Sequence, residues 1–76
     1  MSDLPGAFRD RLRTAIAHDP RTMREISRIS GYDEAYIRRL CNGERCNPTL
    51  AFVEVMSKTL NCDPAWMLGM KEKNDA

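Results

Sequence analysis

The stretch over residues 23–43, MREISRISGYDEAYIRRLCNG, constrains the fold of this chain more than any other. Two segments of helical periodicity meet at Gly31, and glycine readily adopts the left-handed backbone conformation that ends a helix. Thr22 and Glu25 have the spacing of a capping box, which begins the first segment. Asp33 is the natural N-cap of the second segment. We therefore predict two short helices joined by a tight turn.

Three other segments carry helical signals. Apolar residues recur at helical spacing from about residue 7 to residue 18, and again from residue 50 to about residue 60, where Thr49 is the N-cap. Asp63 caps a short last helix with Pro64 at its first position. In the helix after Thr22, the residues expected to point inward are Met23, Ile26 and Ile29. In the helix after Thr49 they are Leu50, Val53, Met56 and Leu60, with Phe52 beside them.

No strand pattern is evident, so the fold class predicted is all-α, a compact five-helix bundle. We expect a flexible lead-in over residues 1–6, one domain over residues 7–69, and a polar, frayed tail over residues 70–76. Arginines 9, 11 and 13 are expected on a solvated face of the first helix.

The composition bounds the class of protein. Seventy-six residues, 42% of them hydrophobic and 30% charged, are typical of one small globular domain. No apolar run approaches the ~20 residues that span a bilayer, and the opening MSDLPGAF lacks the apolar core of a signal peptide. We therefore expect a cytoplasmic protein without a membrane partner.

The reactive side chains are few and scattered. Cys41, Cys46, Cys62 and the one histidine, His18, do not have the spacing of a zinc site, and we interpret the cysteines as reduced thiols. No glycine-rich phosphate loop and no nucleophile–base pair is evident. We therefore expect no enzymatic activity, no cofactor, no metal and no small-molecule ligand.

The positive charge is distributed unevenly. The formal net charge is only +1, but all nine arginines lie at or before Arg45 and all three lysines lie after it. Arginine's planar guanidinium suits phosphate and guanine better than the ammonium group of lysine does. This asymmetry indicates that the N-terminal two thirds of the chain form the contact surface.

The spacing of Ser27, Gly31 and Ile37 is a motif: a small residue, a glycine four later, and an aliphatic residue six beyond that. These residues allow two helices to cross closely around a tight turn. The motif continues in YIRRLCNG over residues 36–43, NPTL over residues 47–50 and DPAWMLG over residues 63–69. Together these pieces resemble the Cro and phage λ repressor class of helix-turn-helix domains, the XRE-like family, over about residues 8–69.

The resemblance implies that the second helix of the pair enters the DNA major groove. Its base-reading positions are Glu34, Ala35, Arg38 and Arg39, and an arginine bound to guanine is worth ~1–3 kcal/mol of discrimination. Either arginine could instead touch only phosphate or pair with Glu34, and Glu34 could accept from cytosine or orient Arg38. The expected phosphate contacts are Thr22, Arg24, Tyr36, Asn42, Arg45 and Asn47. Relatives often have glutamine where Met23 and Glu34 stand.

The function expected from this resemblance is that of a sequence-specific transcriptional regulator of the phage or prophage repressor type. It would bind double-stranded DNA at a palindromic operator as a homodimer. Trp66, Met67 and Met70 are candidates for the dimer interface, and Trp66 is equally a candidate for closing the monomer core. The alternative is a protein-interaction module of the same fold, such as an antitoxin or an accessory factor. The low net charge and the acidic start of the predicted reading helix favour that alternative.

Overall fold

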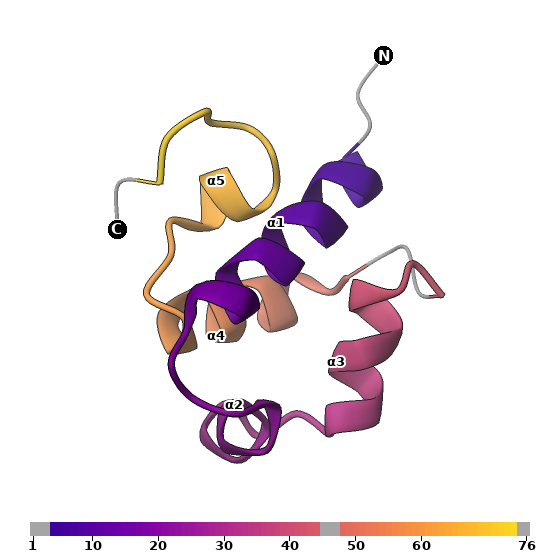
Figure 1. Cartoon of the computed structure of the whole chain (residues 1–76). Coiled ribbons are helices and arrows are strands. Elements are labelled where there is room, and N and C mark those ends of the chain that lie inside the picture. Colours follow the sequence, from indigo (N-terminus) through magenta and orange to yellow (C-terminus); the bar gives the residue numbers. More distant parts are fainter. Residues whose placement is uncertain (1–3, 45–47, 75–76) are drawn as a thin grey trace.

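A computed structural model describes residues 4–44 and 48–74 of the chain, and over these residues the fold is entirely helical. The elements are α1 (Leu4–His18), α2 (Met23–Ser30), α3 (Glu34–Cys41), α4 (Leu50–Thr59) and α5 (Pro64–Met67). The prediction of an all-α fold with five helices is therefore confirmed for the described part of the chain (Figure 1).

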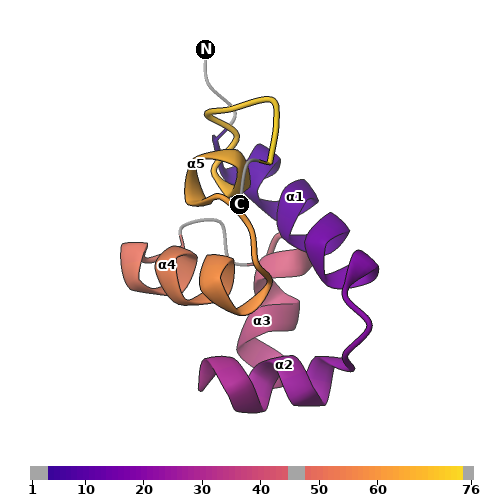
Figure 2. The same cartoon turned by 90° about the vertical axis from the view of Figure 1, so that its left-hand side faces the viewer.

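Helix α1 crosses the molecule diagonally in Figure 1 and contacts α5 on one side and α3 on the other. The second layer is formed by α4, which contacts α2 and α5. Figure 2 shows α2 running across one end of the molecule, with α3 rising from it. This arrangement leaves α2 and α3 together at the end of the molecule away from α5.

Local capping explains where most helices begin and end. Both halves of the predicted capping box are present: the Thr22 side chain accepts from the Glu25 amide, and the Glu25 side chain accepts from the Thr22 amide. Thr49 accepts from the amide of Phe52 at the start of α4. The first helix begins at Leu4, earlier than the predicted residue 7, because a proline is tolerated in the first turn of a helix. The expected lead-in is thus partly helical.

The core is one cluster of buried side chains drawn from all five helices. Two inward predictions were wrong, because Ile29 is 52% exposed and Leu50 is 82% exposed. A helix has about 3.6 residues per turn, so residues spaced three apart, such as Ile26 and Ile29, do not stay on one face of the helix. The half-buried residues at this end of α2 are Ser27 and Ser30, and Ile29 is exposed. Leu50 is the first residue of α4. The buried apolar residues are Phe8, Leu12, Ile26, Ile37, Leu40, Phe52, Val53, Met56, Leu60, Cys62 and Met67.

The segment after α5 is tied to the body of the protein, unlike the frayed tail that was expected. Arg11 donates through Nη1 to the carbonyl oxygens of Trp66, at 2.8 Å, and Lys71, at 2.5 Å. Its guanidinium also lies 5.1 Å from the centre of the Trp66 ring. Lys71 Nζ lies 2.7 Å from Asp63 Oδ2, and Asn74 Oδ1 accepts from the Asp63 amide at 2.8 Å. Arg11 therefore does not belong to a solvated face, and Trp66 packs against the monomer core.

Candidate functional site

The connection between α2 and α3 is a tight turn built by a glycine and two serines. Gly31 has a φ of +82°, and its amide donates to the carbonyl oxygen of Ser27 at 2.9 Å. The Ser27 hydroxyl donates to the carbonyl oxygen of Tyr32, and Ser30 Oγ accepts from the Tyr32 amide at 3.3 Å. Side chains of α2 thus satisfy the polar backbone groups that the turn leaves unpaired.

Apolar side chains fix the rotation of α3 about its own axis. Ile37 and Leu40 are buried on α3, and Ile26 is buried on α2. On the side toward α4, the Tyr36 ring stacks on Tyr32 with centroids 5.7 Å apart, and both rings meet Phe52 edge-on. Tyr36 was predicted to contact phosphate, and the structure places its half-buried ring within this aromatic group.

With that face buried, the predicted base-reading residues share the opposite side of α3. Ala35, Arg38 and Arg39 are exposed, and Glu34 is half-buried. Glu34 and Arg38 are one turn apart and form an ion pair, with Arg38 Nη2 3.3 Å from Glu34 Oε1. The backbone carbonyl of Arg39 accepts from the Glu44 amide at 2.9 Å, whereas its guanidinium forms no hydrogen bond or ion pair with another residue of the described ranges. The four residues therefore form one outward surface, on which Arg38 is partnered.

The charge of α3 changes sign along its length. Asp33 occupies the predicted N-cap position, although its side chain makes no capping hydrogen bond. Asp33 is exposed, and with Glu34 in the first turn it makes the leading end of α3 acidic. Arg38 and Arg39 make the last turn basic.

The predicted phosphate contacts differ in how free their side chains are. The hydroxyl of Thr22 is used within the capping box, 3.1 Å from the Glu25 amide nitrogen and 3.2 Å from Glu25 Oε1. Hydrogen bonds from the Thr22 amide and hydroxyl lower the pKa of Glu25, so a carboxylate sits beside this hydroxyl.

Among the other predicted phosphate contacts, Arg24 is exposed and makes no ion pair with any described residue. Asn42 is the C-cap of α3, and its Nδ2 lies 3.5 Å from Glu44 Oε2. Arg45 and Asn47 lie outside the described residues.

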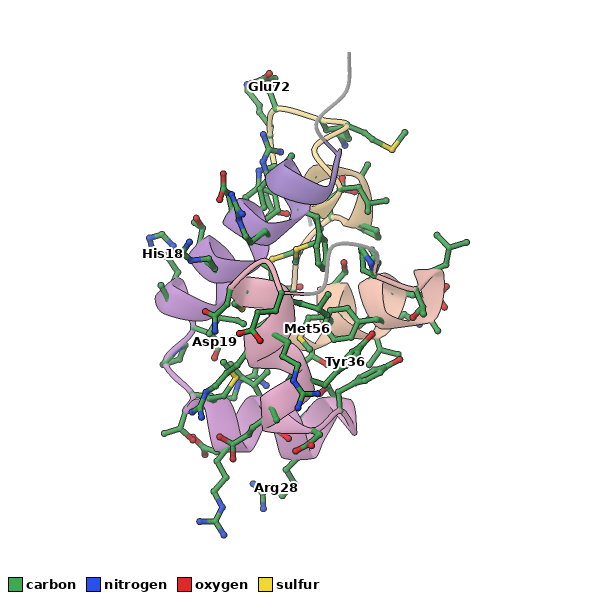
Figure 3. The ribbon with its side chains drawn as sticks, turned by 90° about the vertical axis from the view of Figure 1, so that its right-hand side faces the viewer. His18, Asp19, Arg28, Tyr36, Met56 and Glu72 are labelled. Carbon is green, nitrogen blue, oxygen red and sulfur yellow. The ribbon has the colours of Figure 1, made fainter. Side chains whose placement is uncertain are left out.

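A hollow of about 500 Å³ lies between α2 and α3. Arg24, Arg28 and Glu34 line it together with Glu25 and Ser27. Arg28 was not predicted as a site residue, although its position four residues after Arg24 puts both arginines on one side of α2. In Figure 3, Arg28 projects from α2 away from the other helices. The hollow is lined by charges of both signs.

A second hollow, of about 490 Å³, lies between α1, the end of α4 and α5. Its titratable groups are engaged within the protein: His18 Nδ1 lies 2.9 Å from the Thr14 carbonyl oxygen, and a hydrogen bond from Arg21 lowers the pKa of Asp19 to about 2. Burial raises the pKa of the Cys62 thiol, which disfavours the reactive thiolate. Figure 3 shows His18 and Asp19 on a flank away from Tyr36.

Within residues 4–44 and 48–74, no three histidine, cysteine, aspartate or glutamate side chains gather where they could hold a metal ion. In the same ranges, no helix has both the length and the apolar character needed to cross a membrane.

Comparison of the chain with protein-family models, with curated proteins and with solved structures found no match.

Proposed function

We propose that this protein is a sequence-specific transcriptional regulator that binds double-stranded DNA through a helix-turn-helix formed by α2 and α3. The observation that carries the proposal is the outward surface of α3. Ile37 and Leu40 are buried against the body of the protein, so Ala35, Arg38 and Arg39 point away from it. An exposed helix held at its flank by a second helix is the geometry that fits a major groove.

The reading chemistry follows from the side chains on that surface. Arg39 is free to form two parallel hydrogen bonds to O6 and N7 of guanine, an interaction worth ~1–3 kcal/mol of discrimination. Arg38 reaches a base edge with Glu34 as its neighbour, and the carboxylate of Glu34 accepts from the amino group of cytosine or holds Arg38 in place. The resemblance to small phage and prophage repressors of the XRE-like family gives the proposed mechanism, in which occupancy of an operator blocks or positions RNA polymerase.

The proposed binding unit is a homodimer on a palindromic operator, acting in the cytoplasm. A single α3 contacts ~4–5 base pairs, which is too few to select one site in a genome, whereas two half-sites one helical turn apart are enough. The proposed activity requires no catalysis, no cofactor and no small-molecule ligand.

The test is selection of bound sequences from random duplex DNA at low salt, with the wild-type chain and with Arg38→Ala and Arg39→Ala. The proposal expects a palindrome with the wild-type chain, and relaxation of one base position per half-site with each variant. Lys58→Ala, which removes a positive charge on α4, is the control and should select the wild-type sequence. Failure of the wild-type chain to enrich any sequence would overturn the proposal.

A second candidate function is a protein-interaction module, and specific observations favour it. The leading end of α3 carries Asp33 and Glu34, which repel phosphate, and Ile29 and Leu50 expose apolar surface. Salt dependence separates the two functions. If a dimer neutralises six or more phosphates, its DNA affinity should fall by ~10³-fold between about 50 and 200 mM salt. Weak binding with a flat salt response would favour the protein partner.

A further inference from the structure

Two arginines of α1 lie beside the last turn of α3, at the end opposite to Asp33 and Glu34. The packing of α1 on α3 brings them there, and in Figure 1 the last turn of α3 points toward the N-terminal half of α1. Arg9 lies across Gly43, because a Cβ atom added at Gly43 would be 3.0 Å from Arg9 Nη1 and 3.4 Å from Arg9 Cδ. This guanidinium therefore sits at the exit of α3.

Arg13 is one turn further along the same face of α1. It is exposed, and its guanidinium forms no hydrogen bond or ion pair with another residue in the described ranges. It lies close to Cys41, the last residue of α3: burial raises the pKa of that thiol, and the charge of Arg13 acts in the opposite direction. Arg9 and Arg13 thus flank the C-terminal end of α3 from one side.

The charges around the C-terminal end of α3 favour the binding of an anion more than those around its N-terminal end do. Arg9 and Arg13 of α1 and Arg39 in the last turn of α3 supply three positive charges, and Asp10 and Glu44, next in sequence to Arg9 and Gly43, supply two negative charges. The Arg9–Asp10 pair is loose, at 3.5 Å, and the two side chains are 41% and 67% exposed, so solvent screens it strongly. At the leading end of α3, by contrast, Asp33 is exposed and Glu34 lines the hollow between α2 and α3.

Resting on the proposed DNA-binding function, we propose that Arg9 and Arg13 contact the phosphate backbone of duplex DNA beside the C-terminal end of α3. Arginine presents a planar set of donors that matches two phosphate oxygens. Phosphate contacts fix the position of a protein on the duplex and supply affinity that does not depend on sequence. The α1 arginines would therefore offset the repulsion between phosphate and the acidic start of α3.

A purely structural role makes a different prediction. Cations near the C-terminus of a helix stabilise it through the helix dipole. In that case, removal of Arg9 or Arg13 would lower the free energy of unfolding and leave the salt dependence of DNA binding unchanged.

The experiment measures binding of the full chain to a fluorescent random-sequence duplex by anisotropy, over a range of potassium chloride concentrations. Arg9→Gln and Arg13→Gln are each expected to lower the slope of log affinity against log salt by ~1 per protomer, and to weaken binding by ~10-fold at 0.1 M salt. The loss should be equal on different DNA sequences. Arg9→Lys, which keeps the charge, should retain most of the slope. Urea unfolding of each variant reports any change in stability.

Lys58→Gln is the matched control, because it removes one positive charge near the C-terminal end of α4, which lies on the left in Figure 1 while α3 lies on the right. A second measurement on the wild-type chain is modification of arginines by phenylglyoxal, read by mass spectrometry. Bound DNA should protect Arg9 and Arg13. Steep salt-dependent binding that neither glutamine variant alters, with no protection of these arginines, would overturn the inference and leave the proposed function standing. Absence of wild-type binding at low salt would instead overturn the proposed function.

Discussion

Arg38 and Glu34 form an ion pair on the outward side of α3, with Arg38 Nη2 3.3 Å from Glu34 Oε1. The two side chains are 61% and 35% exposed, so water screens their attraction, and such a pair one helical turn apart is worth only ~0.3–0.5 kcal/mol of stability. Its larger consequence is for binding. Glu34 places a negative charge on the surface proposed to face DNA, and it restrains an arginine that would otherwise be free.

We predict that Glu34→Gln strengthens non-specific DNA binding severalfold and weakens discrimination between operator and random sequence. The substitution removes a charge that phosphate repels and releases Arg38 to reach the backbone. Anisotropy titrations with operator and random duplexes measure both effects, and the midpoint of urea unfolding should change little. Glu54→Gln, at an exposed position of α4, is the matched control for net charge. An equal gain with both variants would mean that the position of Glu34 has no particular role.

Gly31→Ala and Gly69→Ala should differ in cost, although both glycines have a φ of +82°. An alanine at Gly31 would meet no atom within 4 Å, so its cost is the left-handed backbone alone, ~1–2 kcal/mol. At Gly69 the new Cβ would lie 2.6 Å from the Cβ of Ala7, which adds a steric cost of ~1–3 kcal/mol. Urea unfolding of the two variants measures the difference. Equal costs would show that the segment after α5 can move away from Ala7 of α1 without a loss of stability.

Most helix boundaries, though not the start of α1, could be predicted because their signals are local. Thr22, Glu25 and Gly31 act on amides and carbonyls within a few residues, and the structure has each of them in the predicted role. The burial of individual side chains could not be predicted as well, because it depends on which helix covers which. Ile29 and Leu50 have the right spacing for the core and are exposed.

In the candidate site, a contact between residues one helical turn apart could also be predicted, whereas contacts between distant residues could not. The spacing of Glu34 and Arg38 indicated a possible pair, and their distance confirms it. Contacts between distant parts of the chain left no pattern in the sequence. Arg11 donates to carbonyl groups 55 and 60 residues away, and Arg9 lies across Gly43 through the packing of α1 on α3. Such contacts depend on tertiary structure, which local periodicity does not encode.

Ser57→Ala should stabilise the protein. Ser57 is buried in α4, and its hydroxyl has no hydrogen-bond partner among the described residues. Alanine removes an unsatisfied polar group and has the higher helix propensity, so we expect a gain of ~1 kcal/mol, or about 4–8 °C in Tm. Thr49→Ala is the contrasting variant on the same helix, because its hydroxyl accepts from the Phe52 amide at 3.0 Å. That variant should lose ~1 kcal/mol. Thermal unfolding of both variants measures the two signs, and a loss with Ser57→Ala would show that its hydroxyl is in fact satisfied.

The link between α1 and α2 should make stability fall in acid. Arg21 Nη2 lies 2.8 Å from Asp19 Oδ2 and also donates to the Thr59 carbonyl oxygen, and the hydrogen bond from Arg21 lowers the pKa of Asp19 from 3.8 to about 2. A carboxylate whose pKa is lower in the folded state stabilises it fully above the unfolded value, and this contribution is lost as the pH falls from about 4 to about 2. Urea midpoints measured from about pH 6 to pH 2 should therefore fall less steeply for Asp19→Asn than for the wild-type chain.

The Arg21→Gln variant should flatten the same part of the curve of stability against pH. The double variant should resemble either single variant, since each removes the same interaction. Parallel curves for Asp19→Asn and the wild-type chain would show that this pair is not what couples folding to pH, and that Glu25 and Asp63, whose pKa values are also lowered, account for the acid sensitivity.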